Sequence, residues 1–236
     1  MTRRLSPLIA VLTVMLCQSA SALENVKFRR LSIEDGLSQS TVVAIVQDQA
    51  GFMWIGTEDG LNRFDGYNFK QYRHDPDDPS SISGNNVKSL LVDGDGFLWV
   101  GTWTAGLNRY DPRSETFTRF KHEPSDPHSI SSDRIRSLAQ DSRGNLWIST
   151  RDAGINCLEP GTSRFLRIRH DPEDAASLPS DNVRCVSAAS VDTLWIATNR
   201  GFSRYDLKSG EFTHHRAGSG APGSPPSDNV RHILED

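Results

Sequence analysis

A tryptophan recurs at nearly constant spacing along this chain of 236 residues, and its surroundings recur with it. The copies stand at Trp54, Trp99, Trp147 and Trp195. The intervals of 45, 48 and 48 residues hold short apolar stretches separated by Gly, Asp and Pro. A period of this length, with a fixed tryptophan and turn glycines, is typical of β-propeller blades. We therefore expect an all-β fold with the four tryptophans in its core.

The second copy shows how one repeat divides into four strands. Strands are predicted at residues 87–92, 98–102, 107–110 and 117–120, with a tight hairpin turn at Asp93-Gly94-Asp95-Gly96. No stretch has the 3.6-residue periodicity of an amphipathic helix. The residue two places after the tryptophan in the second strand is small in every copy, which predicts crowding near a common axis. These small residues are Gly56, Gly101, Ser149 and Ala197.

The repeats predict four complete blades, near residues 39–80, 81–130, 131–178 and 179–217. Two shorter segments resemble single strands of a blade. Residues 28–31 match the fourth strand, and residues 227–236 match the first strand of a fifth blade. Propeller rings close by pairing terminal strands, which removes exposed sheet edges. We interpret residues 23–236 as part of a larger ring, and the chain as an N-terminal fragment; a closed four-bladed ring is the alternative.

The first 22 residues have the pattern of an export signal. Arg3 and Arg4 precede an apolar run from Leu8 to Cys17, and Ala20-Ser21-Ala22 supplies the small residues of a cleavage site. The apolar run is about half of the roughly 20 residues that a spanning helix needs. We therefore predict a signal peptide at residues 1–22 and a periplasmic mature chain, with a retained anchor as the alternative.

Two recurrent motifs are interpreted as structural. In the first copy, Asp48, Gly51 and Trp54 predict a turn whose carboxylate caps backbone amides beside a core tryptophan. The Asp93–Gly96 turn lacks the further ligands of a calcium loop. His74, His122 and His170 recur in loops between blades, too far apart around a disc to share one metal ion, so a repeated loop-stabilising contact is expected. We predict neither a metal site nor a cofactor.

The repeats resemble those of the two-component regulator propeller family. The matching segments are Asp-Gly-Leu at 35–37, Trp-Ile-Gly-Thr at 54–57, Gly-Leu-Asn-Arg-Phe-Asp-Gly at 60–66 and the His-Asp-Pro to Ser-Ile-Ser loop at 74–83. The resemblance implies seven-bladed rings in the periplasmic sensing region of receptors. In such receptors a histidine kinase or a diguanylate cyclase follows a transmembrane helix, and some members sense carbohydrate fragments. It therefore implies a sensor whose output domain lies outside this chain.

One set of cationic residues is the candidate ligand site. Lys88, Arg136, Arg184 and Arg231 occupy one equivalent position near the start of the first strand, where the first blade has Val43. Such a ring would focus positive potential, and arginine forks suit carboxylates or sulfates of an anionic glycan fragment. Trp103 is a candidate for stacking on a sugar ring. The alternative is that the cations extend past apolar neighbours without binding anything and that Trp103 is a packing residue.

Two cysteines follow the signal segment, and both fall at strand positions. Cys157 and Cys185 replace Arg, Ala or Ser of other repeats. An exported protein can form a disulfide. Because other repeats have no cysteine at these positions, we favour two buried, unpaired thiols instead.

Three functions compete for this chain. The first is an extracytoplasmic sensor module that is covalently linked to membrane receptor domains in the whole protein. The intact receptor would then be a candidate homodimer. The second is a standalone secreted binding propeller or a non-functional truncated product. An enzyme is least favoured, because acidic residues fall mostly at repeat-equivalent turns, whereas catalytic residues should break the repeat. The net charge of −4 gives no reason to expect nucleic acid.

Overall fold

The computed structural model describes residues 28–218, 220 and 224–233. The chain separates into two units, residues 1–31 and residues 32–236. The predicted signal peptide at 1–22 lies outside the described residues. Residues 28–31 are the described part of the first unit, and they form no strand. The blade that these residues are expected to complete is not among the described blades, so their role as a closing strand stays a prediction.

The second unit is built from four antiparallel sheets of four strands each in its described residues, preceded by a 3₁₀ turn, η1 (Ile33–Asp35). Within every sheet the strands lie in chain order, so each repeat forms one complete blade. The strands are β1 (Val42–Gln47), β2 (Met53–Thr57), β3 (Gly60–Phe64), β4 (Phe69–Tyr72), β5 (Val87–Val92), β6 (Leu98–Thr102), β7 (Leu107–Asp111), β8 (Thr116–Phe120), β9 (Ile135–Gln140), β10 (Leu146–Thr150), β11 (Ile155–Leu158), β12 (Phe165–Ile168), β13 (Val183–Ser190), β14 (Thr193–Thr198), β15 (Gly201–Asp206) and β16 (Phe212–His215). The fold is all-β and of the propeller type, as predicted.

Turn chemistry sets the strand boundaries. In the second blade β5 and β6 have the predicted bounds, and β7 and β8 each gain one residue. The carboxylate of Asp93 accepts hydrogen bonds from the backbone nitrogens of Asp95 and Phe97 and from Nε1 of Trp99, at 3.0, 2.9 and 2.7 Å. Gly96 has φ 87°, a left-handed conformation that glycine adopts without steric cost. The turn interpretation of this motif is confirmed, and the same tryptophan–aspartate bond recurs at Trp54 and Trp147.

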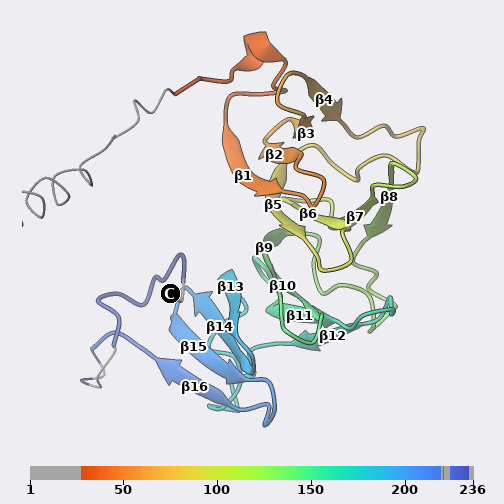
Figure 1. Cartoon of the computed structure of the whole chain (residues 1–236). Helices are drawn as coiled ribbons and strands as arrows, with labels where there is room; N and C mark the ends of the chain where they lie inside the picture. Colours follow the sequence, from red (N-terminus) through yellow and green to blue (C-terminus); the bar gives the residue numbers. More distant parts are fainter. Residues whose placement is uncertain (1–27, 219, 221–223, 234–236) are drawn as a thin grey trace, which may run out of the picture. The chain divides into compact units, whose positions relative to one another are not determined.

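Neighbouring blades meet along their first strands. β1, β5, β9 and β13 lie side by side at the inner edges of the sheets, whereas β4, β8, β12 and β16 lie at the outer edges (Figure 1). The predicted crowding is present: a Cβ atom on Gly101 would stand 2.5 Å from Cγ2 of Ile135 in the next blade. Gly56 faces Val87 in the same way. The small residues therefore receive the first apolar residue of the following blade.

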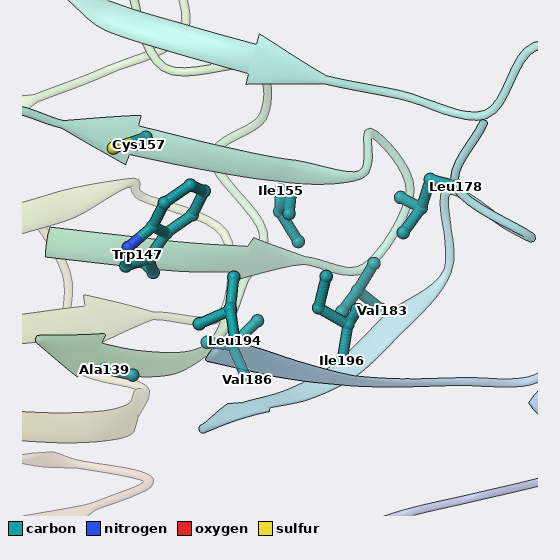
Figure 2. Close-up of a cluster of buried hydrophobic side chains, with 9 residues drawn as sticks. All are labelled: Ala139, Trp147, Ile155, Cys157, Leu178, Val183, Val186, Leu194 and Ile196. Carbon is teal, nitrogen blue, oxygen red and sulfur yellow. The ribbon is translucent and has the colours of Figure 1, made fainter. Parts of the chain in front are cut away.

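The core is divided into clusters that bridge blade junctions. Figure 2 shows the cluster between the third and fourth blades, where the indole of Trp147 faces side chains from both sheets. Its labelled members are Ala139, Trp147, Ile155, Cys157, Leu178, Val183, Val186, Leu194 and Ile196. Trp54, Trp99 and Trp147 are buried as predicted. Trp195 is only half-buried, because it packs on Phe202 and His215 of its own blade, whereas Trp54 lies against Tyr110 of the next blade.

Repeated polar contacts stabilise the loops that connect the blades. Nδ1 of His74 lies 2.9 Å from the carbonyl oxygen of Ile82. His122 and His170 make the equivalent contact, so the loop-stabilising role predicted for these histidines is confirmed. The guanidinium of Arg119 donates to carbonyl oxygens of the same loop as His74. These loops set where each following blade begins.

Residues 224–233 make the same backbone contacts as the loops that precede the other blades, but they form no strand. The backbone nitrogen of Gly201 donates to the carbonyl oxygen of Asp228 at 2.6 Å, as Gly154 does to Asp181 one blade earlier. Val230 then donates to the carbonyl oxygen of Thr198. The strand predicted at 227–236 is not formed over residues 227–233, because no neighbouring strand in the described chain hydrogen-bonds to them along a ladder; residues 234–236 lie outside the described residues.

Candidate functional site

Two sets of side chains alternate where the inner strands begin. The predicted set is the second residue of each inner strand, such as Lys88 and Arg136. The other set directly follows the threonine that ends each second strand, and that threonine pairs with the first residue of the inner strand, as Thr102 does with Val87. This pairing places both sets next to each other on one edge of the blades. We call the following residues the rim: Glu58, Lys88, Trp103, Arg136, Arg151 and Arg184.

Trp103 is the centre of the rim. Nζ of Lys88 lies 5.4 Å from the centre of its indole ring, and Cζ of Arg136 lies 5.9 Å from it. Cζ of Arg151 is closer, at 4.9 Å. Cations within about 6 Å of an aromatic face are attracted by its quadrupole. One half-buried indole therefore gathers three positive charges from two blades.

The arginines of the rim repel one another. The pKa of Arg136 lies below its ordinary value, first because the group is partly buried and then because Arg184 and Arg151 stand nearby. Nη1 of Arg136 donates to Oδ1 of Asn182 at 3.3 Å, a neutral partner that supplies no counter-charge. Nε of Arg184 is buried and makes no hydrogen bond within the described part of the chain. A buried donor without an acceptor is costly, so an incoming acceptor would be favoured here.

Two carboxylates lie beside these cations, and they differ in how strongly they are already bound by neighbouring side chains. Oε1 of Glu58 lies 3.4 Å from Nζ of Lys88, a long and partly exposed ion pair. Asp152 receives a shorter contact of 3.0 Å from Arg134 and a hydrogen bond of 2.7 Å from Ser132. Asp152 is therefore already neutralised, whereas Glu58 holds Lys88 only weakly.

The structure unites most of the predicted site residues. Lys88, Arg136 and Trp103 lie together, and Arg184 stands next to Arg136. Arg231 is exposed, and no contact within the described part of the chain joins it to the rim, because residues 227–233 do not form the expected strand. Arg151 was missed: its membership follows from strand pairing, and the signal available in the sequence was its position after Thr150, equivalent to that of Trp103 after Thr102.

Other features of the described residues recur between blades and are therefore architectural. Grooves of about 510 and 490 Å³ open at equivalent places, one lined by Arg169, Asp174 and Phe212 and the other by Lys121, Asp126 and Phe165. No group of three metal-ligating side chains is present among the described residues. The same residues contain no helix with the length and apolar character that crossing a membrane demands.

Both described cysteines are free. Cys157 and Cys185 are buried and unbridged, as predicted. Burial, followed by the nearby carboxylates of Asp141 and Glu159, raises the pKa of Cys157 to about 12. Such a thiol stays protonated at neutral pH and acts as a small apolar side chain.

Comparison with known proteins shows which families and structures this chain resembles. A family model described as "two component regulator propeller" matches residues 36–59, 81–104 and 129–152, one segment in each of the first three blades. A histidine kinase named P4 from Formosa agariphila is 54% identical over 59 residues, which are 25% of this chain and 4% of that protein. The chain thus spans a small part of that relative.

Solved structures agree in fold. An extracellular domain assigned to a hybrid two component system of B. thetaiotaomicron matches with a TM-score of 0.77 and 30% identity, over 88% of this chain and 28% of that one. A second extracellular domain, assigned to a one component system of the same organism, has a TM-score of 0.60 and 21% identity over 74% of this chain and 25% of that one, and it supports the fold alone. The first three blades of this chain therefore match the two component regulator propeller repeat, and the first of these structures has the same fold over 88% of this chain.

Proposed function

We propose that this chain is an extracytoplasmic input module of a transmembrane signalling receptor, whose output domain is a histidine kinase or a diguanylate cyclase outside the chain. The supporting observation is the 30% identity, over 88% of the chain, to an extracellular domain assigned to a hybrid two component system. The chain spans 28% of that domain, so the module is one part of a larger sensing region. In this proposal the blades bind a ligand, and binding biases the receptor.

We assign the ligand to the rim. Its side chains are cations and an indole, a set suited to holding an anion rather than to transferring protons or forming covalent bonds. Such a ligand is a small anionic molecule, of which an acidic glycan fragment is one example.

The module proposal is tested by following the protein in its own cell. An epitope tag after Gly66 enters an exposed turn, where no atom lies within 4 Å of the position that a side chain would occupy, so it should leave the blades intact. We expect the tagged product in the membrane fraction, digested by added protease in spheroplasts and protected in intact cells. A soluble periplasmic product would instead indicate a standalone binding propeller, and a protease-resistant cytoplasmic one would refute export altogether.

A further inference from the structure

The rim carries more positive charge than its own carboxylates neutralise. Lys88, Arg136, Arg151 and Arg184 supply four positive charges, and among the described residues only Glu58 forms an ion pair with any of them. Asp152 lies near Arg136 but is bound by Arg134. The four cations thus exceed the one paired carboxylate by three charges, and three of the four, Lys88, Arg136 and Arg151, surround a single indole. Their mutual repulsion is a cost that a bound anion would relieve.

We infer that the rim between the second and third blades binds a ligand with at least two negative charges, held by Lys88, Arg136 and Arg151 around Trp103, and that Glu58 competes with this ligand for Lys88. The inference rests on the proposed function only in that the module binds a ligand. A single negative charge would leave most of the excess in place, so the affinity should rise steeply with each added charge.

Trp103 organises the cations rather than serving only as a packing residue. Its ring lies within 5.9 Å of all three cationic groups, and these come from the first strands of two blades and from Arg151 after β10. Attraction to the ring offsets part of their repulsion before the ligand arrives. The cations are thereby held close together, and the entropy lost on binding is reduced.

Two residues that adjoin the rim cations or Trp103 each have a buried polar atom without a hydrogen bond among the described residues. Nε of Arg184 makes no hydrogen bond within the described residues, and Arg184 stands close enough to Arg136 to perturb it. Oδ1 of Asn86 is likewise buried and unbonded there, and the carbonyl oxygen of this residue accepts from the backbone nitrogen of Trp103. One atom is a donor and the other an acceptor, so each would be stabilised by a polar group that reaches it.

Glu58 sets a threshold for binding. Its 3.4 Å contact with Lys88 is long for an ion pair, and its carboxylate is nearly half exposed. An anion with two charges can displace it, because the ligand gains Arg136 and Arg151 at the same time. A weak or singly charged anion cannot compensate for the lost pair.

The test uses three carboxylates that share one carbon chain and differ by one negative charge each: butyrate, glutarate and tricarballylate. Calorimetric titration of the exported chain at low salt should show affinity rising about tenfold with each added carboxylate. Inorganic phosphate is titrated in parallel. Comparing its affinity with that of glutarate shows whether the site prefers two charges on one group or on two separate carboxylates. Arg151→Ala and Arg136→Ala should each weaken tricarballylate binding about fivefold, whereas the exposed Arg113→Ala, with the same change in charge, should not.

Glu58 is tested by Glu58→Gln, with the exposed Glu173→Gln as the charge-matched control. We expect Glu58→Gln to tighten tricarballylate binding about threefold and Glu173→Gln to leave it unchanged. Equal affinity for butyrate and tricarballylate, or equal losses in Arg151→Ala and Arg113→Ala, would overturn the rim site. Either outcome would leave the input-module proposal standing, because location in the cell tests that proposal independently.

Discussion

Ser83 and Asn108 exchange two hydrogen bonds across 25 residues of sequence. The backbone nitrogen of Ser83 donates to Oδ1 of Asn108, and Nδ2 of Asn108 donates to Oγ of Ser83, both at 2.8 Å. Both residues are buried, and Asn156 forms the same pair with Ser131 one blade later. The pair ties the loop entering a blade to the third strand of that blade.

Replacing this amide with a carboxylate should destabilise the second blade. Asn108→Asp removes the donor to Ser83 and buries a negative charge with no cationic partner, which costs about 2–4 kcal/mol of unfolding free energy. Urea denaturation at pH 7 measures the loss. It should shrink as the pH falls and the new carboxyl becomes protonated, whereas Asn229→Asp, at an exposed position, should have little effect at any pH. A loss that is independent of pH would contradict the buried-charge explanation.

The turn carboxylate is expected to act through the tryptophan. Asp93→Asn keeps an acceptor for the backbone amides but turns an NH₂ group toward Nε1 of Trp99, so two donors face each other. We expect a loss of about 2 kcal/mol in unfolding free energy. The exposed neighbour Asp95→Asn provides the control. Equal stability of the two variants would show that the indole bond contributes nothing.

Blade packing leaves no room for a methyl group at Gly101. A Cβ there would lie 2.5 Å from Ile135 and 2.3 Å from Oγ of Ser89, so Gly101→Ala should cost about 1–3 kcal/mol through forced displacement of the blades. At Gly94 the nearest atom would be 3.9 Å away, and Gly94→Ala should change stability far less. Thermal unfolding followed by circular dichroism compares the two. Similar melting temperatures would mean that the junction is looser than the contacts indicate.

Alkaline pH should weaken the contact between the first and second blades. Burial, followed by the hydrogen bond with Tyr72, raises the pKa of Tyr110 above its ordinary value of 10.0. Because the folded pKa is the higher one, this contribution to stability is complete below pH 10 and is lost as the pH rises beyond it. Each pH unit above 10 should remove about 1.4 kcal/mol.

Tyr110→Phe isolates that contribution. The variant loses a hydrogen bond of 3.1 Å at every pH, but its unfolding free energy should fall less steeply between pH 9 and pH 11 than that of the parent chain. The exposed Tyr67→Phe should keep the parental slope. Parallel slopes for all three proteins would argue against ionisation of Tyr110 as the cause.

The thiols of Cys157 and Cys185 should not react with alkylating reagents until the chain unfolds. With a pKa of about 12, Cys157 has a thiolate fraction near 10⁻⁴ at pH 8, and both cysteines are buried. Iodoacetamide should leave the folded chain unmodified and should alkylate both residues in guanidinium without any reductant. Alkylation that appears only after reduction would reveal a disulfide.

The blades were predictable because turn residues recur with the tryptophan. Asp93 and Gly96 mark a hairpin whose two strands, β5 and β6, have the expected bounds. The pairing of Ser83 with Asn108 was not predictable, since nothing in either local pattern indicates a partner 25 residues away. Residues 28–31 match a strand pattern equally well, yet a pattern carries no information on whether a hydrogen-bonding neighbour is present.

The candidate site was predictable in part for the same reason. Repeat alignment finds Lys88 and Arg136, because equivalent positions within one strand are visible in the sequence. It does not reveal that Arg151 stands beside them, since that follows from the register of β9 with β10. Chemistry shared between two strands becomes visible only once their pairing is known.

Each blade is tied to a segment that follows it in the chain. The backbone nitrogens of Gly60, Gly106, Gly154 and Gly201 donate to Asn85, Asp133, Asp181 and Asp228, each in the loop that leads onward. A finished third strand thus provides the docking point for residues about 25 positions later. The chain can therefore assemble in the order in which it is synthesised, with each completed blade acting as the template for the next.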